Sequence, residues 1–254
     1  MSESVDIRNL LRSWPYDPDD DTRFVRGRDG RDLMQVRTPL GVEQYELEGR
    51  PDGHRPHDSE SALDYFYAKL EHARSNGEEA AFALNERECA ELFNEGTIYY
   101  FRYVRLFQMK DWARTMRDTA RNLKAFDFIH RYAKREEDKQ FLEKWRPYII
   151  RVNASAAAML ELERNAYDIA STILGSAISK IEGLEELDDE TFVFERERSL
   201  TGLRTLLDQI QKNKPLSDVE RLEHQLRRAI ERQEFERTAQ LRDRIRDLKN
   251  QKAC

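Results

Sequence analysis

The sequence of 254 residues has little of the residue types that interrupt regular structure, with 10 glycines and 7 prolines. It has only two cysteines, Cys89 and Cys254, and no hydrophobic run long enough to cross a membrane. So few cysteines exclude a disulfide framework, and we expect a protein of the reducing cytoplasm. The N-terminus lacks a basic segment followed by an apolar one, so no secretion signal is expected.

The common catalytic and cofactor motifs are missing as well. The sequence lacks a phosphate-binding glycine loop, a metalloprotease histidine pair and a nucleophile elbow. The acidic run from Glu182 to Glu190 lacks the ligand spacing and the central glycine of a calcium-binding loop. We therefore predict no catalytic, cofactor-binding or metal-binding residues, no cofactor and no enzymatic activity.

Charged residues, in contrast, are abundant. They make up 36% of the chain, hydrophobic residues make up 39%, and the formal net charge is -6. With so few glycines and prolines, this composition favours a mainly α-helical protein. Residues 1–101 carry 12 basic and 22 acidic side chains, whereas residues 102–151 carry 14 and 7. The whole chain is not expected to bind nucleic acid or a membrane, but a local basic surface can exist.

Turn residues concentrate in residues 22–57, which hold five of the ten glycines. The pair Asp29-Gly30 predicts a type I′ hairpin turn, which needs positive φ at both central residues. Pro39 to Gly41 predicts a second turn. We expect strands over 24–28, 31–37 and 42–47. They would form a three-stranded meander that packs on a helix, because so small a sheet is not stable alone.

The segment GRPDGHRPH, residues 49–57, follows this meander. One interpretation is a rigid loop that presents Arg50, His54, Arg55 and His57 to an anion or a metal. The other is a tight, solvated exit from the sheet. The two histidines have the spacing of metal ligands, but no cysteine or carboxylate is positioned to complete a site. Turn chemistry explains these residue types and favours the second interpretation.

From residue 58 onward, apolar residues recur at helical spacing. We expect one helix over 62–76, and then two helix–turn–helix units whose second helices begin near Trp112 and Tyr167. The stripe of Tyr99, Tyr103 and Phe107 has the spacing of a core-facing helix side. The two units resemble degenerate tetratricopeptide repeats, although their separation of 55 residues exceeds the usual period of about 34. The resemblance implies a helical-repeat-like bundle over residues 58–189.

The second helix of the first unit carries a basic row beside its apolar face, formed by Arg114, Arg117, Arg121 and Lys124. Residues three and four positions apart share one face of a helix. The row can be a solvated face that is paired with acidic neighbours. It can also be a strip that binds an acidic partner or the phosphates of a nucleic acid. The sequence leaves both interpretations open.

The last 65 residues read as one long helix and a helical hairpin. Residues 190–214 show the heptad-like spacing of a connecting helix, and Lys214-Pro215 interrupts it. Two amphipathic helices follow, with a turn at Gln233-Glu234. Their apolar faces are Leu222, Leu226, Ala229 and Ile230 on the first, and Phe235, Thr238, Leu241, Ile245 and Leu248 on the second. Matched faces and a minimal connection predict an antiparallel hairpin.

This stretch, LEHQLRRAIERQEFERTAQLRDRIRDL, resembles the UVR motif. That hairpin is shared by the excision-repair proteins UvrB and UvrC and by bacterial protein-quality-control factors such as McsA and ClpC. The resemblance rests on the Phe235-Glu236 pair, Ala239 and the Leu241-Arg242-Asp243 triplet. Leu226 stands where methionine is frequent, and Thr238 replaces the first of two usual alanines. Both differences conserve approximate size.

The resemblance implies a module that binds a protein partner. The partner-binding residues that it implies are Leu222, Leu226, Phe235, Glu236, Ala239, Leu241, Arg242, Asp243 and Ile245. Phe235 is the expected anchor of this surface. A hairpin this short buries little by itself, so a partner, a second hairpin in a homodimer, or the chain's own helices are expected to cover its apolar face.

We therefore predict a mainly α protein with a small N-terminal β-meander and a C-terminal antiparallel helical hairpin. Its expected parts are residues 1–57, the helical domain 58–189, the connecting helix 190–214 and the hairpin 215–254. The leading hypothesis is a non-catalytic adaptor or scaffold in the bacterial cytoplasm, acting in excision repair or in stress and protein quality control. The alternative is a nucleic-acid-binding accessory factor that uses the row from Arg114 to Lys124.

Overall fold

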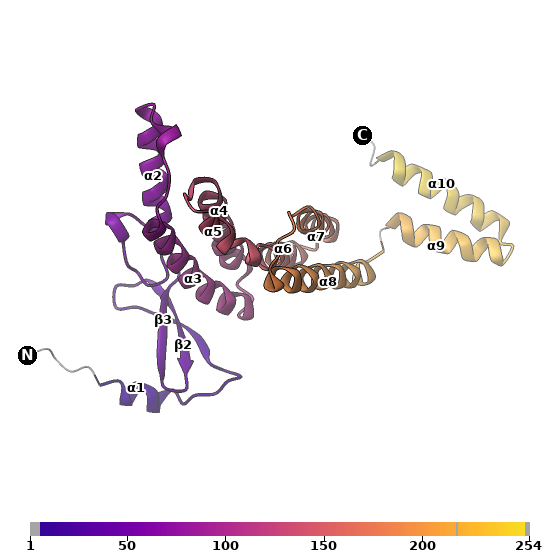
Figure 1. Cartoon of the computed structure of the whole chain (residues 1–254). Helices are drawn as coiled ribbons and strands as arrows, with labels where there is room; N and C mark the ends of the chain where they lie inside the picture. The colour runs from indigo at the N-terminus through magenta and orange to yellow at the C-terminus, as the bar shows by residue number, and fades with distance from the viewer. Residues whose placement is uncertain (1–5, 217, 252–254) are drawn as a thin grey trace, which may run out of the picture. The chain divides into compact units, whose positions relative to one another are not determined.

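A computed structural model of the chain describes residues 6–216 and 218–251. The chain forms two compact units, Met1–Leu207 and Asp208–Cys254. Figure 1 shows a mainly helical protein with a small antiparallel sheet and a C-terminal helical hairpin, so the predicted fold class is confirmed. None of the described helices is long and apolar enough to cross a membrane.

The N-terminal part of the first unit is the expected meander. After the short helix α1 (Arg8–Ser13) come the strands β1 (Thr22–Arg26), β2 (Asp32–Thr38) and β3 (Gly41–Glu46). The strands pair antiparallel in the order β1-β2-β3. The alternation of side chains in β2 directs Met34 and Val36 to one face, where they pack with Leu106 of helix α3. The predicted packing of the sheet on a helix is confirmed.

The first hairpin turn differs from the expected type I′ turn. Gly30 has a φ of 80°, but Asp29 is not among the described residues with positive φ. The backbone N–H of Gly27 donates to the carbonyl oxygen of Arg31 at 2.7 Å, so the loop holds three residues rather than two. The carboxylate of Asp29 accepts the N–H of Arg31 at 3.0 Å, which fixes this longer turn. The second turn, at Pro39 and Leu40, lies where it was predicted.

The helices of the first unit follow in sequence. They are α2 (Ala62–Ser75), α3 (Glu86–Gln108), α4 (Trp112–Tyr132), α5 (Glu136–Phe141), α6 (Arg146–Glu163), α7 (Tyr167–Glu182) and α8 (Glu190–Asn213), with 3-10 turns at Pro56–Asp58, Glu79–Ala81 and Glu143–Trp145. Helices α3 and α4 form one antiparallel hairpin, and α6 and α7 form another, with α4 packed on α6 (Figure 1).

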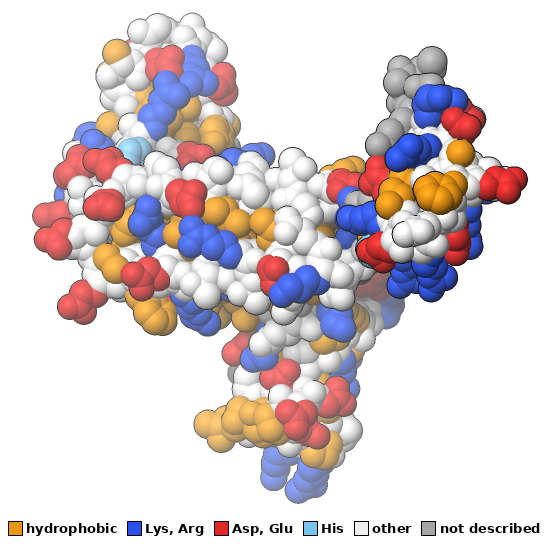
Figure 2. Space-filling view, turned by 90° about the vertical axis from the view of Figure 1, so that its right-hand side faces the viewer, with side chains coloured by type: hydrophobic (Ala, Val, Ile, Leu, Met, Phe, Trp, Pro, Cys, Tyr) orange, Lys and Arg blue, Asp and Glu red, His pale blue; other side chains and the backbone are white. Residues whose placement is uncertain are grey.

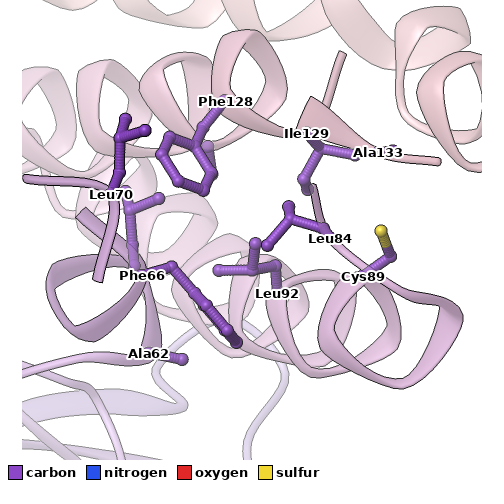
Figure 3. Packing of buried hydrophobic residues seen from close by; sticks show 11 residues of the cluster. Ala62, Phe66, Leu70, Leu84, Cys89, Leu92, Phe128, Ile129 and Ala133 are labelled. Carbon is purple, nitrogen blue, oxygen red and sulfur yellow. The ribbon is translucent and has the colours of Figure 1, made fainter. Parts of the chain in front are cut away.

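The main hydrophobic core lies where α2, α3 and α4 meet. Phe66 and Leu70 of α2 face Phe128 and Ile129 of α4, with Leu92 of α3 between them (Figure 3). Each of these side chains is at most 2% exposed. The predicted helix that begins after Ser61 supplies the α2 side of this core, and the Ser61 side chain caps its N-terminus by accepting the N–H of Asp64 at 3.1 Å.

Both helical hairpins of the first unit turn in the same way. Helix α3 is followed by Lys110 with a φ of 61°, and the N–H of Asp111 donates to the carbonyl of Leu106 at 2.9 Å. Helix α6 is followed by Asn165 with a φ of 59°, and the N–H of Ala166 donates to Glu161 at 2.9 Å. These are Schellman motifs, in which one left-handed residue reverses the chain. The next helix then begins with an aromatic residue, Trp112 or Tyr167.

A buried ion pair connects the sheet with these helices. Arg102 of α3 donates to both carboxylate oxygens of Asp118 on α4, at 2.6 and 2.8 Å. Its remaining terminal nitrogen donates to the carbonyl oxygen of Glu46 at the end of β3, at 2.7 Å. The Arg102 and Asp118 side chains are 0% and 1% exposed. Because a buried charge must be compensated, this pair fixes the position of the strand relative to the hairpin.

The second unit contains helices α9 (Asp218–Glu231) and α10 (Phe235–Gln251). They pack against each other along their length, with Arg232 to Glu234 as the connection. The antiparallel hairpin predicted for this region is confirmed.

Candidate functional site

The turn of the C-terminal hairpin repeats the geometry of the two turns in the first unit. Gln233 has a φ of 56°, and its N–H donates to the carbonyl of Ile230 at 3.0 Å. The N–H of Glu234 donates to the carbonyl of Ala229 at 2.9 Å. This is again a Schellman motif, here with glutamine in the left-handed position. Neither glycine nor asparagine stands at this position, which is why only the place of the turn was predicted and not its geometry.

A short apolar seam holds α9 and α10 together. Ala229 is 2% exposed, and Leu241 and Ile245 are each 8% exposed. Leu222, Leu226, Thr238 and Leu248 are half-buried around these three residues. The seam is therefore a small apolar interface between α9 and α10, and its residues face each other rather than solvent. Of the implied partner-binding residues, Leu241 and Ile245 are consequently occupied in closing the hairpin.

Two apolar residues expected in this seam lie outside it. Phe235 is 80% exposed and Ile230 is 50% exposed. Phe235 precedes Leu241 by six residues, which at about 100° per residue turns its side chain about 120° away from the seam. Ile230 follows Ala229 directly and is likewise rotated out by about 100°. The expectation that both residues belong to the internal face was wrong, and the tip of the hairpin instead presents them to solvent.

The exposure of Phe235 is unusual among the three equivalent aromatic residues. Trp112, at the same position after the first Schellman turn, is 7% exposed, stacks edge-on against Phe107 and donates from its indole nitrogen to Glu163 at 2.9 Å. Tyr167, after the second turn, is half-buried. The same local geometry thus buries an aromatic side chain in the helical body and leaves one bare in the hairpin.

The remaining residues of the implied binding surface lie on the outside of α10. Glu236, Ala239, Arg242 and Asp243 are all exposed. Ala239 follows Phe235 by four residues and Arg242 by seven, so these three share one helix face. Asp243 pairs with Arg246 at 2.9 Å, whereas the structure gives Arg242 no carboxylate partner among the described residues. Figure 2 looks toward the tip of the hairpin and shows apolar side chains exposed among charged ones.

The basic row of α4 is engaged with carboxylates of the protein itself. Arg114 contacts Glu48 at 3.2 Å and Asp111 at 2.8 Å, and Arg117 contacts Glu48 at 2.5 Å. Arg121 is largely buried and lies against the fully buried Glu95. Lys124 alone is exposed. The row is therefore a paired face that ties α4 to the sheet, and this placement gives no support to a nucleic-acid strip.

The loop of residues 49–57 is likewise held by internal ion pairs. Arg50 contacts Asp52 at 2.9 Å and Glu95 at 2.9 Å. The His57 ring stacks on Tyr65 with centroids 4.0 Å apart and contacts Glu91 at 2.9 Å. No group of three potential metal ligands is found among the described residues. These contacts agree with a structural exit from the sheet.

Residues 184–189, within the acidic run, line a cavity of about 430 Å³ between α5 and the start of α8. Its walls also include His130, Lys144, Leu184 and Phe192. Lys144 lies 3.6 Å from Asp189, and Asp189 accepts the backbone N–H of Thr191 in the first turn of α8. The acidic residues whose contacts are seen here cap and position a helix, and they do not assemble a metal site within the described part of the chain.

Comparison with known proteins bears on the hairpin alone. Neither the search of curated proteins nor that of solved structures found a match. The tetratricopeptide-like resemblance of residues 58–189 therefore receives no support. Residues 219–251, which form α9 and α10, match the family described as the UvrB/uvrC motif. The chain carries a UVR motif, and the hairpin whose tip exposes Phe235 is that motif.

Proposed function

We propose that this protein is a non-catalytic adaptor that binds a protein partner through the exposed face of its C-terminal hairpin. The observation that carries the proposal is the 80% exposure of Phe235 at the tip of a UVR motif, a hairpin that mediates protein interactions in UvrB and UvrC. Burying a phenylalanine side chain contributes about 1.5–3 kcal/mol. The chain's own hairpin does not bury Phe235, so a partner that covers this side chain can gain this free energy.

The surroundings of Phe235 have the composition of a binding surface. Ile230 adds a second exposed apolar side chain at the tip, and Arg242 lies on the same face of α10 as Phe235. Interfaces are enriched in aromatic residues and arginine, and their binding free energy concentrates in a few such residues. A partner with an apolar pocket and a carboxylate at its rim fits this arrangement.

We also propose the cellular system in which this adaptor acts. The UVR resemblance favours a bacterial system of excision repair or of stress and protein quality control. Cys89 is free and buried, which agrees with a reducing cytoplasm. The first unit would then act as the body that the hairpin attaches to its partner.

Affinity capture with the full chain tests the proposal. Proteins retained by the wild type are compared with those retained by Phe235→Ala, by a chain ending before Pro215, and by Phe194→Ala. Phe194 is a matched control because it is 60% exposed and lies outside the hairpin, in the portion of α8 that belongs to the first unit. A specific partner is lost with the first two variants and retained by Phe194→Ala.

Direct binding then measures the contribution of the tip. With the captured partner purified, Phe235→Ala is expected to weaken binding at least tenfold, because a central aromatic anchor contributes about 2 kcal/mol or more. Equal affinity for the wild type and Phe235→Ala, or identical sets of captured proteins, would contradict the proposal.

A further inference from the structure

The C-terminal hairpin has a second face that the UVR motif does not explain. Relative to Ala229 in the seam, Ile230 is rotated by about 100° in one direction and Arg228 by about 100° in the other. Relative to Leu241, Phe235 lies on one side, whereas Arg237 and Arg244 lie on the other. Because α9 and α10 are antiparallel, Ile230 and Phe235 fall on one side of the hairpin and the arginines on the opposite side.

We call this opposite side the arginine face. Its residues are Arg221, Gln225, Arg228 and Arg232 on α9, and Arg237, Gln240 and Arg244 on α10, all of them exposed. Residues 218–248 contain eight arginines and no lysine. Figure 2 shows basic side chains on the surface of the hairpin, together with acidic and apolar ones. A guanidinium group presents several donors in a fixed plane, which suits oxyanions.

In the part of the hairpin that the structure describes, the central arginines of this face have no carboxylate partner. Within the described residues, Arg228, Arg232 and Arg244 form no ion pair, whereas Arg237 is paired with Glu234 at 3.4 Å and Arg221 donates to the carbonyl of Leu216. In the first unit, by contrast, Arg102, Arg114, Arg117 and many other arginines hold carboxylates. Exposed arginines without an ion pair also occur in the described part of the first unit, but on the hairpin Arg228, Arg232 and Arg244 lie together on one face, where an external anion can reach them.

The composition of the arginine face indicates which class of anion it binds. The large exposed apolar residues of α9 and α10, Ile230 and Phe235, both lie on the other side, so the described part of this face has no apolar centre. A protein–protein interface normally has such a centre. Arginine with glutamine and no apolar residue is instead typical of contacts to sugar and phosphate, and interfaces with nucleic acid are more polar and more basic. Asp247 and Glu236 are acidic residues at the edge of the described part of this face.

We propose that the arginine face binds the phosphodiester backbone of a nucleic acid, without sequence preference, through Arg228, Arg232 and Arg244. This site is separate from the face of Phe235, so it does not depend on the protein partner. The chain would then hold a protein on one side of its hairpin and a nucleic acid on the other. Because each arginine–phosphate contact releases counterions from the nucleic acid, the binding is strongly salt-dependent. The net charge of the whole chain is -6, so the attraction is local to this face.

Fluorescence anisotropy with the full chain tests this proposal. The probes are labelled oligonucleotides of about 20 nucleotides, single-stranded and double-stranded, of DNA and of RNA, at low salt. The variant is the triple substitution Arg228→Gln, Arg232→Gln and Arg244→Gln. The matched control is Arg12→Gln, Arg28→Gln and Arg87→Gln, which removes the same charge from exposed arginines of the first unit that form no ion pair among the described residues.

The wild type is expected to bind at least one class of probe, and the triple variant to lose at least tenfold in affinity while the control changes less than threefold. On the double-stranded probe, the slope of log affinity against log salt should fall by about 2 to 3 in the triple variant, because three phosphate contacts are removed. Replacing the same three arginines by lysine should restore most of the binding, which separates lost charge from lost folding.

Three results would overturn the proposal. The first is that the wild type binds none of the probes at low salt. The second is that both triple variants weaken binding equally, which would indicate a general effect of net charge. The third is that polyglutamate competes as well as nucleic acid at equal charge, which would assign the face to an acidic protein. In each case the capture of a partner through Phe235 would be unaffected, so the two proposals fail separately.

Discussion

The backbone N–H of Glu234 donates a hydrogen bond of 2.9 Å to the carbonyl oxygen of Ala229, and this bond closes the turn of the UVR hairpin. It requires the intervening Gln233 to adopt a φ of 56°. The same bond closes the α3–α4 and α6–α7 hairpins around Lys110 and Asn165. One backbone motif thus determines where Trp112, Tyr167 and Phe235 begin their helices, and only the packing around each aromatic residue differs.

Replacing Gln233 by glycine should stabilise the hairpin. A residue with a Cβ atom costs about 1 kcal/mol in the left-handed region, and glycine removes this cost where φ is already positive. We expect slower hydrogen exchange of amides 222–248 in Gln233→Gly. Asn165→Gly is the matched control, and its effect on the α6–α7 hairpin should be smaller because asparagine tolerates this conformation. Unchanged or faster exchange in the Gln233 variant would contradict the expectation.

The buried pair of Arg102 and Asp118 provides a prediction for the first unit. Arg102→Met leaves the Asp118 carboxylate at 1% exposure with Arg117 as its remaining partner, at 2.9 Å. Removing one member of a buried ion pair costs about 3–5 kcal/mol. Urea unfolding followed by tryptophan fluorescence measures this loss, because Trp14, Trp112 and Trp145 all belong to the first unit.

The double variant Arg102→Met, Asp118→Leu separates charge from packing. It removes both charges together, so it should be less destabilised than Arg102→Met alone. If the double variant is as unstable as the sum of the two single variants, the pair does not act as a compensated unit.

The sequence was sufficient for features that depend on local patterns. Apolar spacing located the hairpin helices, and the turn at Gln233 followed from where that spacing stopped. The sheet was predicted with boundaries shifted by one or two residues, and the first turn was wrong because the Asp29 carboxylate fixes a longer loop. Local patterns predict an element well where its own side chains determine its shape.

Features that depend on tertiary contacts could not be predicted in the same way. The sequence left open whether the row from Arg114 to Lys124 is paired or free, and only the fold shows that Glu48 and Glu95 lie against its arginines. The motif implied Phe235 as the expected anchor of a partner surface, but how far its side chain is exposed depends on how α9 packs on α10. The arginine face also required the antiparallel arrangement of both helices, since its members come from two separate helices.

The thiol of Cys89 should be protected from alkylation. Burial, followed by the nearby Asp138 carboxylate, raises the pKa of Cys89 from 9.0 to about 12. At pH 8 the thiolate fraction is then lower by about three powers of ten, and the thiolate is the reactive form. With Cys254 replaced by serine, native protein should react with iodoacetamide about a thousandfold more slowly than protein unfolded in urea. Similar rates in the two states would show that Cys89 is accessible.

Apolar residues of the UVR hairpin lie in two different environments. Phe235 is 80% exposed and Leu241 is 8% exposed, although both belong to α10 and both match the motif. Leu241→Ala should therefore destabilise the hairpin by about 2–3 kcal/mol and accelerate hydrogen exchange of amides 222–248, because it opens the thin seam. Phe235→Ala should leave that exchange unchanged, because it removes no buried contact. A comparable increase in exchange for the two variants would mean that Phe235 supports the fold of the hairpin, and its exposed side chain could then no longer be assigned to partner binding.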